Sequence, residues 1–344
     1  MEASAADTVR IVSRRMVRPS YGASMPMPPS EDIHLTPSDL HAISPACMIQ
    51  IGILLPKPPA GTGGLVDTLA SSLARALGRY YHFAGRLAIV DHGDGTVTVP
   101  LRCTGEGTEL FHAVAPGVAV ADIVGSVRTP SSLVRSFFPP LTGVYADVAI
   151  GSSLPVLWAQ VTELTDGVFI GMTMNHAVGD GTCFWDLFNA WSAFNQGDGD
   201  QLTRAPAPVH QRWVLDAVPV PLSALQSAFG PSVELPPVRE GFFTFSAASV
   251  KKLKAKANDE MMLSATISSL QALIAHLWRA IVRARRLPPG QETTCILVIG
   301  CRGRMRCIPP GYVGNAIAIG MTTGCTAGEV LDKGLGWTAW QLNC

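Results

Sequence analysis

The sequence of 344 residues predicts an α/β protein, because segments patterned as buried strands alternate with segments patterned as amphipathic helices. The clearest strand is 168–174, a bounded apolar run with β-branched and aromatic residues. The clearest helix is 266–286, where six aliphatic residues form one stripe that ends before Pro288 and Pro289. Apolar residues make up 47% of the chain, which is enough to build the cores of two ordinary domains.

The first half of the chain contains its expected elements in close succession. In chain order they are a strand at 9–17, a turn or short capped helix at 35–40, a strand at 48–55, a helix at 65–78 and a hairpin that turns at 91–95. The leucines of the expected helix fall at successive i+4 positions and so line one face of it. A strand at 155–164 comes shortly before 168–174, and the Asp166-Gly167 pair between them favours a hairpin. We therefore expect these two strands to be neighbours in a sheet.

The texture of the sequence changes after residue 195. Residues 196–238 contain spaced prolines and little periodicity, which a long crossing loop between domains explains best. We therefore expect an N-terminal domain at 1–195, a crossover loop at 196–238 and a C-terminal domain at 239–344. The expected elements of the C-terminal domain are strands at 241–246, 293–300 and 316–321 and helices at 247–257, 266–286 and 326–342.

Charge and cysteine content exclude several classes of partner and site. The 26 basic and 26 acidic residues cancel, and the basic residues are dispersed, so neither nucleic acid nor an anionic membrane is an expected partner. No apolar run approaches the length that crosses a bilayer. The eight cysteines show no C-x-x-C pairing, which indicates reduced thiols rather than a metal site or a disulfide framework. Acidic residues interrupt the arginines near the N-terminus and no secretory apolar segment follows, so we expect a cytoplasmic protein without a transit peptide. We also expect a monomer.

The strand at 168–174 leads into the most informative motif of the chain, His176-Ala177-Val178-Gly179-Asp180-Gly181. His176 closes the strand, and Gly179 and Gly181 predict a tight turn in which they permit positive φ and a close backbone approach. Thr182 could cap the helix that follows. A histidine at a strand end and facing a turn is placed where α/β folds carry chemistry. The alternative is a half-buried histidine that bonds the backbone, with Asp180 as a helix-entry residue; the motif alone favours neither. Cys183 is disfavoured as a nucleophile because it lies just inside an apolar helix face.

Four stretches in chain order resemble the BAHD acyltransferases of plants. Residues 35–40 resemble the family's LTP-x-D-L element, and 81–87 resemble its (F/Y)-x-x-A-G-R-L element. Residues 176–181 resemble its H-x-x-x-D-G motif, and 312–315 resemble its Y-x-G-N element. The six-residue motif is shared with other CoA-dependent acyltransferases, whereas the other three are particular to this family. The resemblance implies two chloramphenicol-acetyltransferase-like domains, each a mixed sheet with flanking helices, with a solvent channel between them.

The resemblance also implies a reaction and a set of site residues. His176 would act as general base on a hydroxyl or amine of a small plant metabolite, which attacks the thioester of acyl-CoA; acyl-CoA is a co-substrate, and no bound cofactor or metal is implied. Asp180 would be structural, paired with Arg302. The stretch that would contact CoA contains Ser246, Ser249, Lys251, Lys252 and Lys254, although a solvated basic face explains these lysines as well. The turn and substrate region would contain Gly179, Gly181, Tyr312 and Asn315.

The chain departs from the family's pattern at its C-terminal end. Family members continue to a D-F-G-W-G motif, and nothing from 325 to 344 matches it. We therefore expect the second domain to be incomplete. Two alternatives to acyl transfer follow: a catalytically impaired homologue that only binds ligand, and an enzyme of the same fold that catalyses another reaction, such as an elimination.

Overall fold

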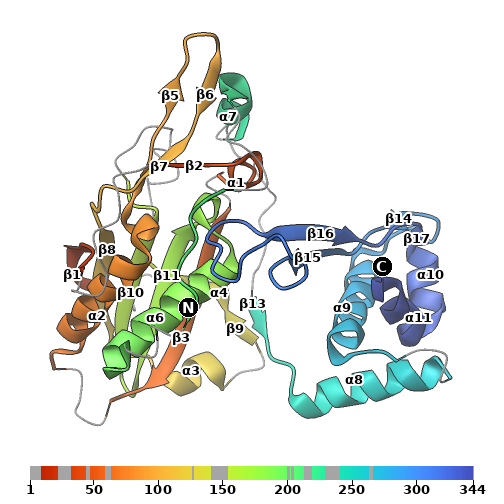
Figure 1. The fold of residues 1–344 in the computed structure, drawn as a ribbon. Helices are drawn as coiled ribbons and strands as arrows, with labels where there is room; N and C mark the ends of the chain where they lie inside the picture. Colours follow the sequence, from red (N-terminus) through yellow and green to blue (C-terminus); the bar gives the residue numbers. More distant parts are fainter. Residues whose placement is uncertain are drawn as a thin grey trace. The chain divides into compact units, whose positions relative to one another are not determined.

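The computed structural model divides the chain into two compact units. One comprises Met1–Phe242 with Met305–Ala316, and the other comprises Phe243–Arg304 with Ile317–Cys344 (Figure 1). The residues that the structure describes are 9–21, 32–43, 47–58, 63–125, 128–140, 154–199, 202, 205–212, 219–228, 241–262 and 266–343. The first unit is therefore not a continuous stretch of chain, because 305–316 returns to it. The predicted α/β class is confirmed.

The first unit is organised around a five-stranded mixed sheet. Across the sheet the strands are β1 (Arg10–Val17), β8 (Thr108–Ala115), β10 (Leu157–Leu164), β11 (Gly167–Asn175) and β3 (Met48–Pro56). Only β8 and β10 run parallel; the other neighbours are antiparallel. The expected hairpin is present, since β10 and β11 pair from Leu157↔Met174 to Glu163↔Val168. All nine residues of β11 are buried, so this strand is covered on both faces.

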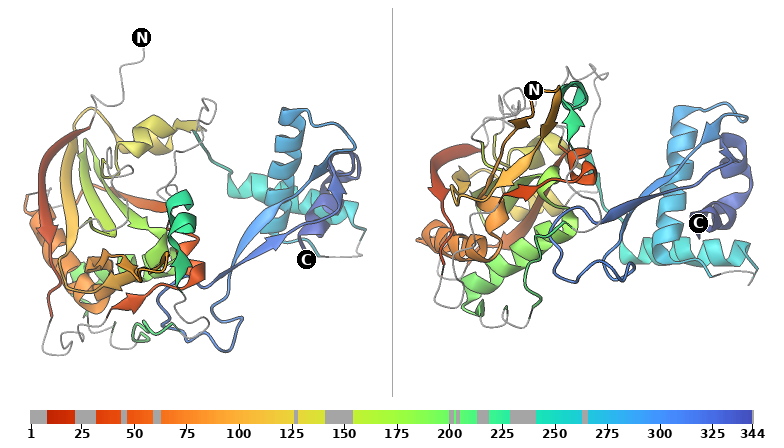
Figure 2. Two further views of the ribbon diagram at one scale, coloured as in Figure 1. Left: turned by 90° about the horizontal axis from the view of Figure 1, so that it is seen from above. Right: turned by 45° about the horizontal axis from the view of Figure 1, so that its top comes forward.

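Two helices, α2 (Leu65–Arg79) and α6 (Gly181–Gln196), lie side by side on one face of this sheet (Figure 2). The predicted leucine stripe of α2 is confirmed, because Leu69, Leu73 and Leu77 belong to the buried core. Trp191 of α6 ties the two helices together: its indole Nε1 donates to the Leu69 carbonyl at 2.9 Å and lies 3.1 Å from the Ser72 hydroxyl. The helix that follows the histidine motif is therefore fixed to the sheet by apolar packing and by a buried hydrogen bond.

Shorter elements complete the first unit. They are β2 (Ile33–His34), α1 (Pro37–Leu40), the 3-10 helix η2 (Tyr81–Ala84), β4 (Arg86–Leu87), β5 (Val90–Asp91), β6 (Thr96–Thr98), β7 (Pro100–Arg102), α3 (Val120–Val124), β9 (Arg128–Pro130), α4 (Ser131–Arg135), the 3-10 helix η3 (His176–Val178), β12 (Val220–Pro221), α7 (Leu222–Ala228) and β13 (Gly241–Phe243), whose last residue already belongs to the second unit. The hairpin predicted to turn at 91–95 is formed by β5 and β6. The short helix predicted at 35–40 is α1, with Thr36 and Asp39 forming its capping box.

The second unit combines helices with short strand pairs. Its elements are α8 (Ala247–Glu260), α9 (Ser269–Arg285), β14 (Glu292–Thr293), β15 (Ile296–Gly300), β16 (Ile317–Met321), β17 (Cys325–Thr326), α10 (Ala327–Asp332), α11 (Gly334–Trp340) and the 3-10 helix η5 (Gln341–Asn343). The predicted helix at 266–286 is α9, which begins after the Ser268 cap and ends at Arg286. Small residues let its neighbours pack closely, because Ala272 and Ala275 are buried against α8 and α11, whereas Leu270 is 65% exposed.

The single helix predicted at 326–342 is wrong. The structure has two helices there, α10 and α11, which meet at Lys333 and Gly334. Gly334 has φ +92, a conformation that favours glycine and that a continuous α-helix does not contain. The Glu260 carboxylate then accepts a hydrogen bond from the Gly336 main chain at 2.7 Å, which anchors the start of α11 to the end of α8. No helix within the described ranges is long and apolar enough to cross a membrane.

Candidate active site

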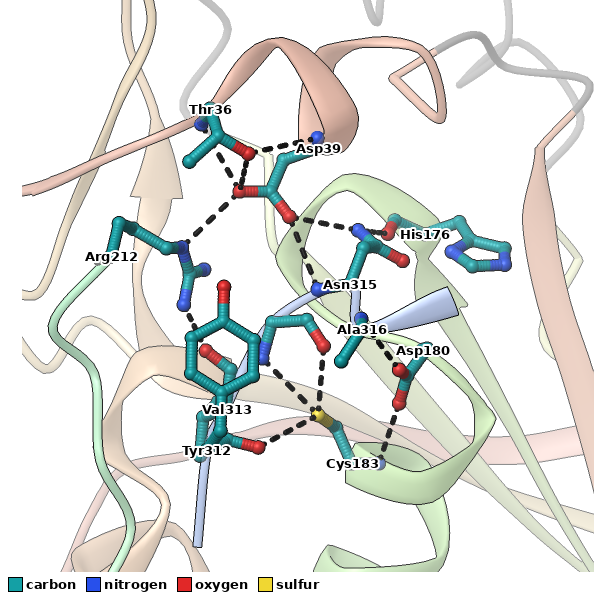
Figure 3. A network of polar contacts seen from close by, with 11 residues as sticks. Thr36, Asp39, His176, Asp180, Cys183, Arg212, Tyr312, Val313, Asn315 and Ala316 are labelled. Carbon is teal, nitrogen blue, oxygen red and sulfur yellow. Dashed lines mark hydrogen bonds and ion pairs between the residues drawn. The ribbon is translucent and has the colours of Figure 1, made fainter. Parts of the chain in front are cut away.

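His176 lies where the buried strand β11 ends and the chain turns. The Asn175 side-chain oxygen accepts a hydrogen bond from the Ala177 main chain at 2.9 Å, which starts the 3-10 helix η3. The His176 N–H donates to the Cys47 carbonyl at 3.2 Å. His176 itself is half-buried, and its Nδ1 is buried without a hydrogen-bond partner among the residues that the structure describes. The imidazole points away from the polar network around it (Figure 3).

Asp180 caps helix α6 rather than facing the imidazole. One carboxylate oxygen accepts from Thr182 N at 3.0 Å and Cys183 N at 3.2 Å, and the other accepts from Ala316 N at 3.0 Å. Asp180 is 2% exposed, and a carboxylate at this position also interacts favourably with the helix dipole. The cap is therefore Asp180, and the expectation that Thr182 caps this helix is wrong. The pairing of Asp180 with Arg302 stays a prediction, because the two residues belong to different units.

The turn glycines have a different role from the expected one. Gly179 has φ 172, which is extended backbone, and Gly181 is the first residue of α6, so neither uses the left-handed region. Close packing explains Gly179, because a Cβ there would lie 2.9 Å from the Cys183 Cβ. A Cβ at Gly181 would meet nothing within 4 Å. The prediction of a close backbone approach therefore applies to Gly179 alone.

The segment 311–316 returns from the second half of the chain to this turn. The Asn315 side-chain nitrogen donates to the His176 carbonyl at 2.8 Å and to Asp39 Oδ1 at 3.0 Å, and the Asn315 main chain donates to the same Asp39 oxygen at 3.2 Å (Figure 3). Cys183 Sγ accepts from Gly314 N at 3.3 Å. The structure thus brings together the predicted residues His176, Asp180 and Asn315 and places a buried thiol in a packing position between helix and loop.

A buried ion pair lies at the centre of this network. Asp39 is fully buried, and its Oδ2 accepts from Arg212 Nε at 3.2 Å, from the Thr36 hydroxyl at 2.9 Å and from Thr36 N at 3.1 Å. The Arg212 guanidinium also donates to the Val313 carbonyl, and its carbon lies 5.5 Å from the centre of the Tyr312 ring. Sequence reasoning missed Arg212, which stands in a proline-spaced stretch without periodicity. It assigned no role to Asp39, although a buried capping-box carboxylate requires a cationic or polar partner.

The residues predicted to contact CoA are on helix α8 of the second unit. Ser246 caps the helix, and its hydroxyl accepts from Ser249 N at 3.1 Å. A hollow of about 660 Å³ lies beside the helix, lined by Ala247, Val250, Lys251, Lys254, Ala255, Asn258 and Ser269. Lys251 and Lys254 therefore share one face of α8, and Lys252 does not line the hollow. How this hollow relates to His176 stays a prediction, since the two belong to different units.

Two histidines, the buried His82 and the half-buried His210, lie close to Arg212. His82 Nδ1 is 3.1 Å from His210 Nε2, so one imidazole donates to the other. Burial, His210 and Arg212 hold the pKa of His82 well below 6.5, and burial with Arg212 lowers the pKa of His210 to about 4. Both rings are therefore neutral near pH 7. No group of three or more metal-ligating side chains occurs in the part of the chain that the structure describes.

Fold and site together define an α/β protein whose candidate base closes a buried strand of a mixed sheet. A family model described as the Transferase family matches residues 8–343. An uncharacterised acetyltransferase of Arabidopsis thaliana is 36% identical over 97% of this chain and 75% of its own length. The chain belongs to the BAHD acyltransferase family.

Further relatives carry more specific names. The BAHD acyltransferase DCR of Arabidopsis thaliana is 29% identical over 95% of this chain and 69% of its own length. A hydroxycinnamoyl-CoA:5-hydroxyanthranilate N-hydroxycinnamoyltransferase of Avena sativa is 32% identical over 76% of this chain and 61% of its own length.

Solved structures share the fold. Vinorine synthase matches with a TM-score of 0.65 and 19% identity over 97% of this chain and 75% of its own. The TRI101 protein of F. sporotrichioides, complexed with coenzyme A and T-2, matches with a TM-score of 0.63 and 20% identity over 91% of this chain and 73% of its own. The predicted acyltransferase fold is therefore confirmed.

The capping role of Asp180 predicts a clear difference between two neighbouring variants. Asp180→Ala removes the acceptor of three main-chain N–H groups, so the free energy of unfolding should fall by about 2 kcal/mol. Thr182→Ala leaves the cap in place and should change it by less than about 0.5 kcal/mol. Urea unfolding of both variants measures this, and an equal loss in the two would contradict the assignment of the cap.

The neutral histidine pair predicts acid sensitivity. The pKa values of both rings are lower in the folded state than the usual 6.5, so below pH 6.5 the unfolded chain binds protons that the folded chain does not. Stability should therefore be greatest above pH 6.5 and fall toward pH 4, with His210 contributing roughly 3 kcal/mol of the loss.

Unfolding by urea at pH 7.5, 6.0 and 4.5 tests this expectation. His210→Gln should reduce the dependence of stability on pH, while His92→Gln, at an exposed position of the β5–β6 turn, should leave it as in the wild type. The same pH dependence in all three proteins would show that the His82–His210 pair does not determine acid stability.

Proposed function

We propose that the protein transfers an acyl group from acyl-CoA to a hydroxyl or amine of a small plant metabolite, with His176 as general base. The observation that carries the proposal is a half-buried imidazole at the end of a fully buried strand, in a chain of the BAHD acyltransferase family. A rigid strand end limits the positions that the ring can take, which is what a base needs to meet a bound nucleophile.

The reaction uses one proton acceptor. The imidazole takes the proton of the acceptor O–H or N–H while the oxygen or nitrogen attacks the thioester carbonyl and forms the new bond to carbon. The resulting oxyanion collapses, the carbon–sulfur bond breaks, and CoA leaves as a thiolate that takes the proton from the imidazolium. Imidazole suits this exchange because its ordinary pKa lies close to neutral pH.

The names of similar proteins support acyl-CoA as the donor. The relative from Avena sativa is named for a hydroxycinnamoyl-CoA donor and for transfer to nitrogen, and the TRI101 structure contains coenzyme A. These names concern those proteins. Whether this protein transfers the acyl group to oxygen or to nitrogen has to be determined with a panel of acceptors.

Helix α8 offers a location for the phosphates of CoA. Lys251 and Lys254 line the hollow beside this helix, and Ser246 with Ser249 stands at its N-terminus. Phosphate oxygens are favoured by lysine ammonium groups and by the N–H groups at a helix start. We therefore propose these four residues as CoA contacts, with Lys252 outside the contact face.

Removal of the imidazole should abolish turnover. Purified protein is incubated with acyl-CoA donors and a panel of alcohol and amine acceptors, and thiol release is followed with a chromogenic disulfide. His176→Ala should lower kcat at least about a hundredfold without a loss of folding, because general base catalysis contributes at least this factor. Exposed His92→Gln serves as the matched histidine control.

Two outcomes would contradict the proposed function. A folded protein that binds CoA in calorimetry but turns over no donor and acceptor pair would be a binding protein. Product formed without CoA and without dependence on His176 would indicate another reaction on the same fold.

Charge removal on α8 should weaken donor binding selectively. Replacing Lys251 and Lys254 together with glutamine should raise the KM for acyl-CoA about tenfold, and the effect should shrink at high salt because charge attraction is screened. Lys256→Gln is the control, since this exposed lysine of the same helix lies near Glu260 and outside the hollow. Equal KM values in both variants would exclude this face of α8 as the phosphate site.

A further inference from the structure

Within the described part of the chain, the imidazole of His176 has no partner of the kind that usually orients a catalytic base. A base histidine is commonly held through its second ring nitrogen by a carboxylate or carbonyl group. Here Nδ1 is buried, and no described residue accepts or donates a hydrogen bond to it. Asp180, the nearest carboxylate in the motif, binds main-chain N–H groups instead. The position of the ring must therefore be determined mainly by the backbone that carries it.

The backbone of His176 is held at both of its polar groups. Its N–H donates to the Cys47 carbonyl at 3.2 Å, and its carbonyl accepts from the Asn315 side chain at 2.8 Å. The first contact joins segments that already meet through β3 and β11. The contact with Asn315 joins residues 139 positions apart and is the shorter of the two. It therefore forms only when the returning segment packs against the end of β11.

Asn315 is suited to this contact by its amide group. Its nitrogen faces two acceptors, Asp39 Oδ1 at 3.0 Å and the His176 carbonyl at 2.8 Å, so both amide hydrogens are used. The reverse orientation would place the amide oxygen against two other oxygens, so the geometry fixes the orientation of the amide. A carboxylate or an aliphatic side chain of the same size cannot make either bond.

Asp39 and Arg212 in turn hold Asn315. The fully buried Asp39 carboxylate accepts from both the main chain and the side chain of Asn315. Arg212, whose side chain is 6% exposed, compensates this charge through Nε and binds the Val313 carbonyl two residues before Asn315. Burying a lone carboxylate is costly, so the arginine makes the anionic acceptor possible at this position.

We propose that Asp39, Arg212 and Asn315 are positioning residues for His176. They fix the position of the imidazole by holding the main-chain carbonyl of His176, and they make no contact with the ring nitrogen Nδ1. The loss of catalysis that we expect when these three side chains are replaced rests on the proposed function. The displacement of the imidazole that we expect in the same variants does not depend on that function. A base that moves by about 1 Å can lose on the order of a hundredfold in rate.

Two variants of Asn315 test the proposal. Asn315→Asp keeps the size but places a second carboxylate against Asp39, and Asn315→Leu removes the donor without adding charge. Both should lower kcat on the order of a hundredfold and change the KM for acyl-CoA by less than about threefold, with the smaller loss of thermal stability in Asn315→Leu. Asn195→Asp makes the same change of group at an exposed position of α6 and should leave kcat unchanged.

Nuclear magnetic resonance of the histidine rings gives a readout that does not require turnover. In protein with isotope-labelled histidine, the signal lost in His176→Gln identifies His176. This signal should shift or broaden in Asn315→Leu and stay unchanged in Asn195→Asp. A folded Asn315→Leu variant with an unchanged His176 signal and an unchanged kcat would overturn the proposal.

The two proposals can fail separately. If the wild type turns over no substrate but the His176 signal still moves in Asn315→Leu, the proposed function fails and the positioning role stands. If turnover depends on His176 while Asn315→Leu retains both kcat and signal, the positioning role fails alone.

A double-mutant cycle then tests whether the Asp39–Arg212 ion pair acts through Asn315. Asp39→Asn and Arg212→Gln should each lower kcat, and the combined variant should lose much less than the product of the two losses, because both act through Asn315. Independent effects that multiply would separate Arg212 from the positioning of the base.

Discussion

The buried carboxylate of Asp39 is the interaction on which the rest of the site depends. A charge with no exposed surface has to be compensated, and Asp39 finds its partners in three parts of the chain: Thr36 beside it, Arg212, and Asn315. The separations are 173 residues to Arg212 and 276 residues to Asn315. Removing any one partner leaves a desolvated polar group, so the folding of these three segments is coupled.

The histidine motif divides its work between two residues that lie four positions apart. Asp180 caps the start of α6 and accepts a hydrogen bond from the main chain of Ala316. The buried ring nitrogen of His176, in contrast, has no hydrogen-bond partner among the described residues. An unpartnered imidazole retains a nitrogen for proton transfer, and a rigid environment replaces the orientation that a ring partner would give. The fully buried β11 and the cap of α6 provide that rigidity from both sides of the turn.

The features proposed for catalysis and for donor binding belong to separate units. The base and its supporting network are contained in the first unit, including the returned segment 305–316, and the basic face of α8 is contained in the second. The network of the base is buried and satisfied largely by main-chain groups, whereas the lysines of α8 are exposed. Salt should therefore affect donor binding far more than it affects the geometry of the base.

The sequence by itself determined the α/β class, the β10–β11 hairpin, the leucine face of α2 and the position of His176 at a strand end, because each of these depends on local periodicity or turn chemistry. The motif elements also singled out the stretches that contain Asp39 and Asn315. Only the tertiary structure decided what those residues do, that Arg212 joins them, that Asp180 rather than Thr182 caps α6, and that the last helix is broken at Gly334. These features depend on which distant groups come into contact in a low-dielectric interior, and the spacing of residues along the chain does not specify those contacts.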